Sequence, residues 1–109
     1  MKIAIIGSRT CPEINIASYI EAKPEAIISG GAKGADTYAR KYAIENGITL
    51  IEYLPDYKTY GRIAPIIRNR QIIDACDSVL AFWDGKSHGT KQAIDYAKSQ
   101  GKAVRIIEI

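Results

Sequence analysis

The chain has 109 residues, 47% hydrophobic and 25% charged, and a formal net charge of +3. This composition is typical of one globular domain and excludes a disordered chain, which lacks the apolar residues to build a core. No apolar run approaches the roughly 20 residues that cross a bilayer, and Met1–Gly7 is too short for a signal peptide, so we expect a single cytoplasmic domain over residues 1–109 with no membrane partner.

The first half of the chain alternates apolar and amphipathic segments. A strand is predicted at 2–6, apolar at every interior position as in a central parallel strand, and Gly7 ends it. A helix is predicted from Pro12, with small and apolar residues at helical spacing up to Pro24. A short strand at 26–28 follows, then a helix from about Ala35 to a stop at Gly47.

The second half repeats the alternation. A third strand is predicted at 49–54, broken by Pro55, and the tyrosine-rich segment 56–61 is predicted to be a loop. The remaining predictions are a helix at 64–75, a strand at 78–82, a loop at 83–88, a helix from 89 or 90 to about 100 capped by Gly101, and a strand at 103–107.

Five strands alternating with four helices indicate right-handed crossovers and a parallel sheet. Five units are too few to close a barrel. The fold class is therefore α/β: a Rossmann-like, open, doubly wound parallel sheet of five strands, with expected order 3-2-1-4-5.

Such sheets bind ligands outside the carboxyl ends of their strands, near the switch point in strand order. The loops after strands 1, 2 and 4 are the unusual segments of this sequence: Gly-Ser-Arg at 7–9, Gly-Gly-Ala-Lys-Gly-Ala-Asp at 30–36, and Asp-Gly-Lys-Ser-His-Gly-Thr at 84–90. Glycine-rich turns let backbone N–H groups approach an anion, and a helix N-terminus adds a positive dipole end. Two such turns beside strand 1 predict two anion cradles facing one crevice.

Purely structural roles remain an alternative for each residue taken alone. Glycines are common at strand–helix turns, Thr90 could be an N-cap, and Asp36 a favourable charge in a first helical turn. Asn69 lies at helical spacing with Ile72 and Ile73 and is flanked by Arg68 and Arg70. Either both arginines form a solvated face, or Arg68 and Asn69 reach into the crevice.

Aromatic residues surround the same region. Tyr53, Tyr57 and Tyr60 lie around the loop after strand 3, and Trp83 ends strand 4. These side chains have two alternative roles: one of them could stack on a base, or they could serve ordinary packing at the rim or a subunit contact.

Cysteine and histidine usage points away from metal and redox chemistry. Cys11 and Cys76 have no metal or redox spacing, so we expect thiols in a reducing compartment. His88 is the only histidine and cannot anchor a zinc site without further ligands, so no metal is predicted.

Four segments together resemble the YspA-type, cpYpsA-related branch of the SLOG superfamily, which also holds the DNA-processing protein A (Smf) domain and the LOG proteins. They are Gly-Ser-Arg at 7–9, Ser-Gly-Gly-Ala-Lys-Gly-Ala-Asp at 29–36, Arg-Asn at 68–69, and Ala-Phe-Trp-Asp-Gly-Lys-Ser-His-Gly-Thr at 81–90. The resemblance implies a Rossmann-like fold that binds, senses or processes nucleotides or their derivatives, and a homo-oligomer.

The LOG enzymes are phosphoribohydrolases that cut the base from a nucleoside 5′-monophosphate. Their site pairs an arginine on the third helix with a glutamate just after a Gly-Gly-x-Gly-Thr loop. Arg68 matches the arginine, but the glutamate position is Ala93, which removes a carboxylate useful for breaking an N-glycosidic bond. Asp36 or Asp84 could substitute for it.

Binding of a nucleotide-derived phosphate ligand (AMP-, ADP-ribose- or NAD-like) is therefore the leading expectation. A phosphoribohydrolase-like N-glycosidase using Arg68 with Asp36 or Asp84 is the alternative. Single-stranded nucleic-acid binding is a third and weaker one, because the charge is mild and no dense basic stripe is present. The expected ligand-binding residues are Gly7, Ser8, Arg9, Gly30, Gly31, Lys33, Gly34, Asp36, Arg68, Asn69, Trp83, Asp84, Gly85, Lys86, Ser87, Gly89 and Thr90.

Overall fold

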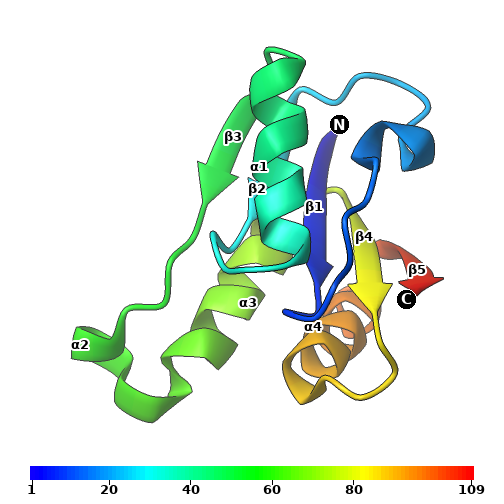
Figure 1. The fold of residues 1–109 in the computed structure, drawn as a ribbon. Coiled ribbons are helices and arrows are strands. Elements are labelled where there is room, and N and C mark those ends of the chain that lie inside the picture. Colours follow the sequence, from blue (N-terminus) through cyan, green and yellow to red (C-terminus); the bar gives the residue numbers. More distant parts are fainter.

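The computed structural model describes all 109 residues and is built on one five-stranded parallel sheet in the order β3-β2-β1-β4-β5 (Figure 1). The predicted fold class and strand order are thus confirmed. The strands are β1 (Lys2–Gly7), β2 (Ala26–Ser29), β3 (Thr49–Glu52), β4 (Ser78–Trp83) and β5 (Ala103–Glu108).

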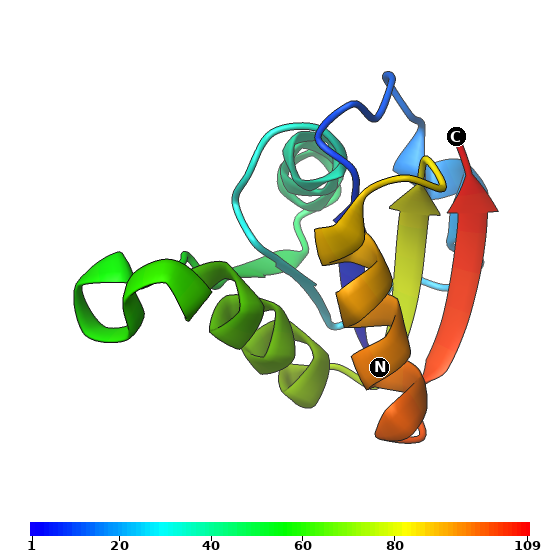
Figure 2. The same ribbon diagram turned by 90° about the horizontal axis from the view of Figure 1, so that it is seen from below.

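Helices cover both faces of the sheet (Figure 2). They are α1 (Ala35–Glu45), the single turn α2 (Tyr57–Tyr60), α3 (Ala64–Ala75) and α4 (His88–Ser99), with 3₁₀ turns at Ile16–Tyr19 and Gly61–Ile63. The helix α1 packs on one face, and α3 and α4 pack side by side on the other. None of these helices combines the length and the apolar character that crossing a membrane requires.

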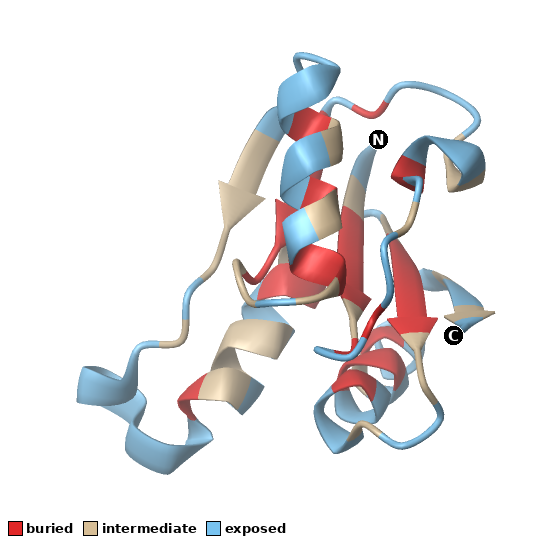
Figure 3. Ribbon diagram, viewed as in Figure 1, coloured by how far each residue is buried: buried red, intermediate tan, exposed pale blue.

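Neighbouring residues of each central strand enter different cores, because side chains alternate between the two faces of a sheet. Ile27 packs in the core beneath α1, whereas Ile28 packs in the core beneath α3 and α4, and neither is exposed. Figure 3 shows the buried residues concentrated on the sheet and on the inner faces of the helices. Cys11 and Cys76 are free, buried thiols in opposite cores.

The helix predicted after Pro12 is wrong, because this segment forms only the 3₁₀ turn Ile16–Tyr19. Asn15 precedes the turn without a capping hydrogen bond from its side chain, and Ile20 is already extended. Ile16 is the only buried residue of the turn. Isoleucines at 14, 16 and 20 also favour helix weakly, because β-branching restricts the side chain against the preceding turn.

Most other boundaries differ from the prediction by one or two residues, and two differences affect the region around β3. The third strand ends at Glu52 rather than Leu54, because its partner β2 ends at Ser29 and Ser29 pairs with Glu52. The expected loop 56–61 contains the turn α2 and the start of a 3₁₀ turn, and the Asp56 side chain caps α2 by accepting from the Thr59 amide at 3.1 Å. The bounds of α3 agree with the prediction.

Candidate functional site

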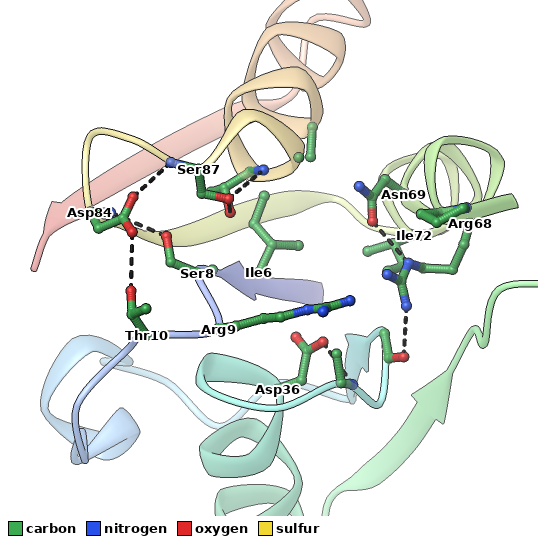
Figure 4. Close-up of a pocket in the computed structure, with 17 residues that line it drawn as sticks. Ile6, Ser8, Arg9, Thr10, Asp36, Arg68, Asn69, Ile72, Asp84 and Ser87 are labelled. Atoms are coloured by element: carbon green, nitrogen blue, oxygen red, sulfur yellow. Dashed lines mark hydrogen bonds between the residues drawn. The ribbon is translucent and has the colours of Figure 1, made fainter. Parts of the chain in front are cut away.

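A cavity of about 390 Å³ opens at the carboxyl ends of the central strands. It lies where the strand order reverses between β1 and β4, which is the position expected for ligands in an open α/β sheet. Its walls come from the loops after β1, β2 and β4, from α3, and from the first turns of α1 and α4 (Figure 4).

Most of the residues predicted from sequence line this cavity. They are Gly7, Ser8, Arg9, Gly30, Asp36, Arg68, Asn69, Asp84, Ser87, Gly89 and Thr90. The predicted residues that do not line it are Gly31, Lys33, Gly34, Trp83, Gly85 and Lys86.

Six further residues line the cavity that were not among the expected ligand-binding residues: Ile6, Thr10, Ala32, Pro65, Ile72 and Ala93. Ala32 lies inside the glycine-rich segment 30–36 and Thr10 directly follows the segment 7–9, so counting each whole segment and one following position would have included both. Ile6, Pro65, Ile72 and Ala93 carry no polar signal, and only the packing of strands and helices brings them to the cavity wall.

Arg9 extends from the loop after β1 across the cavity (Figure 4). Its side chain is exposed and makes no hydrogen bond or ion pair within the protein. An arginine with five unused donors in a concave site can bind a carboxylate or phosphate in a bidentate manner.

Arg68 approaches the same space from α3, but it is half-buried and anchored. Its Nη1 donates to the Gly30 carbonyl at 2.9 Å, and its Nε donates to Asn69 Oδ1 at 2.9 Å. Burial lowers the pKa of the Arg68 guanidinium and nearby Arg9 lowers it further, while Asp36 raises it. The group stays charged, since arginine does not lose its proton in proteins. Like Arg9, Arg68 forms no ion pair with a carboxylate.

Asp36 carries a buried carboxyl in the first turn of α1, on the wall below Arg9 (Figure 4). Its Oδ2 accepts from the Ala32 amide at 3.0 Å, which closes the glycine-rich loop after β2. Burial raises the pKa of Asp36, whereas the Ala32 amide and the charge of Arg68 act to lower it.

Asp84 organises the opposite wall. Its Oδ1 accepts from the amides of Lys86 and Ser87, both at 2.8 Å, and its Oδ2 accepts from Thr10 Oγ1 at 3.0 Å. The two backbone hydrogen bonds are the main cause that lowers the pKa of Asp84 to about 2. The Asp84 amide donates to Ser8 Oγ at 3.2 Å, so this residue ties the loops after β1 and β4 together.

Gly34 explains why the loop after β2 can lie against the loop after β1. Its φ is +81°, a conformation that L side chains rarely adopt. A Cβ at this position would overlap the carbonyl oxygen of Ser8 and would lie 2.9 Å from Arg9 Cα. The glycine therefore positions Arg9 without lining the cavity itself.

The two helices that begin at the cavity differ in charge. In α4, Ser87 caps the N-terminus by accepting from the Thr90 amide at 3.4 Å, and the first turn holds no acidic residue. In α1, the first turn holds Asp36, whose negative carboxylate offsets the positive end of the helix dipole. The α4 end is thus the more favourable place for an anion, because the one carboxylate near it, Asp84, is already paired with two amides and Thr10.

No aromatic side chain lines the cavity. The Trp83 indole instead donates to the Ser87 carbonyl at 3.0 Å and supports the loop before α4. Tyr57 and Tyr60 are 57% and 41% exposed on the arm formed by α2. No three His, Cys, Asp or Glu side chains are grouped so that they could hold a metal ion.

Comparison with known families identifies one match. The model of the YspA, cpYpsA-related SLOG family matches residues 1–60, more than half of the chain. This range includes β1, β2 and both of their following loops, and it ends before α3. No curated protein and no solved structure gives a significant match.

Proposed function

This chain belongs to the YspA, cpYpsA-related SLOG family, and from that premise we propose that its cavity binds the phosphate group of a nucleotide or nucleotide derivative. The observation that carries the proposal is the convergence of Arg9, Arg68 and the N-terminus of α4 on one cavity. Neither arginine forms an ion pair with a carboxylate, so an anionic ligand would supply a counter-charge beyond that of Asp36, whose charge acts on Arg68. The cavity volume of about 390 Å³ falls within the roughly 300–1,000 Å³ of typical ligand pockets.

We assign the phosphate to the side of the cavity formed by Arg9 and the N-terminus of α4. Backbone N–H groups at a helix N-terminus bind anions, and Gly89, in the first turn of α4, lines the cavity and has no Cβ to block an approaching anion. The α1 side is less suitable, because Asp36 repels an anion and the exposed Lys33 does not line the cavity. Asp36 is better suited to accept hydrogen bonds from ribose hydroxyls.

Replacing Arg9 tests this placement most directly, because its side chain makes no bond that the fold needs. We expect Arg9→Ala to weaken AMP binding about tenfold or more, since a hydrogen bond to a charged group contributes roughly 1.5–3 kcal/mol. Isothermal titration calorimetry with AMP, ADP-ribose and NAD measures the effect. Lys33→Ala is the matched control, because it removes a nearby exposed cation that lies outside the cavity.

Absence of heat and of thermal stabilisation with every nucleotide would remove the proposal. Equal losses in Arg9→Ala and Lys33→Ala would show that only general surface charge attracts the ligand, and the assignment of the cavity would be wrong.

The site is better suited to binding than to hydrolysis of the glycosidic bond. Asp84 accepts three hydrogen bonds and its pKa is lowered to about 2, so it is a poor proton carrier at neutral pH. Asp36, whose pKa is raised by burial, is the carboxyl that could act with Arg68. Chromatographic detection of free base from AMP, abolished by Asp36→Asn, would establish the hydrolase instead.

A further inference from the structure

A second cavity, of about 430 Å³, lies between the outer surfaces of α3 and α4. It shares Asn69 and Ala93 with the first cavity, so the two hollows are neighbours on either side of these residues. Position 93 presents only a methyl group, and a longer side chain there would stand between the two hollows. We call this second cavity the α3–α4 groove.

One wall of the α3–α4 groove is a stacked cation–aromatic pair. The guanidinium carbon of Arg70 lies 5.3 Å from the centroid of the Tyr96 ring. The Tyr96 hydroxyl donates to Asp74 Oδ1 at 2.7 Å, which restrains the ring. The exposed Arg70 guanidinium lies over the ring and lines the groove with it, and bases stack on guanidinium planes as well as on aromatic rings.

The two cavities are complementary in chemistry. The first holds Arg9 and Arg68 but no aromatic side chain, so a nucleotide phosphate finds partners there and a base finds no aromatic ring to stack on. The groove adds Tyr96 with Arg70, and also the exposed amide of Gln92, which can both donate to and accept from a base edge.

We propose that the α3–α4 groove is the subsite for the base of a nucleotide whose phosphate occupies the first cavity. The ligand would pass Asn69 and Ala93, which line both hollows, and its ribose would stay in the first cavity with Asp36. This inference rests on the proposed function and specifies it, because it makes the base, and not only the phosphate, a recognised part of the ligand.

The test compares AMP with ribose 5-phosphate, which has the same phosphate and sugar but no base. In calorimetry the unaltered protein is expected to bind AMP more tightly. Arg70→Ala is expected to weaken AMP binding about tenfold, the effect of losing a stacking surface, and to leave ribose 5-phosphate binding unchanged.

Arg105→Ala is the matched control, because Arg105 also lies over a tyrosine ring, 5.6 Å from the Tyr19 centroid, but lines neither cavity. It should change neither affinity. Arg70→Lys, which keeps the charge but loses the plane, should reproduce most of the loss for AMP even if Arg70→Ala does not fold.

Equal affinities for AMP and ribose 5-phosphate, or equal losses for both in Arg70→Ala, would overturn the base subsite and leave the phosphate site standing. Binding of neither compound would overturn the proposed function itself, and the subsite with it.

Discussion

Asp84 has a structural role in the site that its position in the sequence does not reveal. Both carboxylate oxygens accept hydrogen bonds within the protein, two from amides of its own loop and one from Thr10. The charge of Asp84 therefore holds two walls of the cavity in place and is not free to act on a ligand. A residue on a ligand-facing loop can thus serve the site by shaping it.

The lowered pKa of Asp84 makes its contribution to stability dependent on pH. Because the folded pKa is about 2 and the ordinary value is about 3.9, the stabilisation is complete above about pH 4 and is lost as the pH falls toward 2. We expect Asp84→Asn to melt at a lower temperature than the unaltered protein at neutral pH, with the difference narrowing from pH 4 to pH 2.

Differential scanning fluorimetry between pH 4 and pH 2 measures the difference in melting temperature between the two proteins. Asp95→Asn is the control, because Asp95 is exposed and its only bond is to Lys91 on the same helix. A difference that stays constant down to pH 2 would contradict the role given to the Asp84 charge.

The helices α1 and α4 both follow glycine-rich loops at the cavity, but different side chains hold those two loops in place. The glycine-rich loop before α1 is closed by Asp36 and Ala32, whereas the loop before α4 is closed by Asp84 and capped by Ser87. The two glycine-rich turns predicted two anion cradles facing one crevice. The first turn of α1 holds an acidic residue and that of α4 does not, and at α4 the acidic residue is Asp84 in the preceding loop, already bonded to the Ser87 amide.

The cap of α4 gives a prediction at the scale of this helix. Ser87→Ala should lower the free energy of unfolding by about 0.5–1 kcal/mol, because the Thr90 amide loses its acceptor at the helix start. Urea unfolding measures this change. Ser99→Ala is the control at the other end of α4, and we expect a smaller loss there; equal losses would argue that the cap contributes nothing specific.

The arm around α2 exposes apolar side chains that sequence patterning would place in a core. Leu54, Tyr57 and Ile63 are 65%, 57% and 52% exposed, although all three are apolar. The arm projects away from the sheet beside the start of α3 (Figure 1). Its side chains pack against no core, so the rule that apolar residues are buried does not apply to it.

At the scale of the whole molecule, the sheet separates the core beneath α1 from the core beneath α3 and α4, and the stability of the fold depends on both cores. We expect Ile27→Ala and Ile28→Ala each to lower the free energy of unfolding by about 2–5 kcal/mol, since both side chains are fully buried on opposite faces of β2. Chemical denaturation measures both variants. Ile106→Ala, at a residue 37% exposed on the edge strand β5, should cost clearly less.

A small loss of unfolding free energy for only one of the two variants would mean that the core on that side of the sheet is loosely packed. Small losses for both would contradict the packing of helices on both faces of the sheet as the source of stability.

The residue pattern was enough to predict the alternation of strands and helices, and with it the parallel sheet, its strand order and the edge at which the loops after β1, β2 and β4 meet. The prediction was possible because fully buried strands are apolar throughout and helices repeat their apolar residues every three or four positions. The three-dimensional packing was needed to learn that the segment after Pro12 forms one short turn, that Arg68 lies in the cavity while Arg70 lies over Tyr96, and that Lys33 and Lys86 do not line the cavity. These outcomes depend on contacts between residues far apart in the chain, as when the carbonyl of Gly30 receives Arg68 from α3, and no local pattern records such contacts.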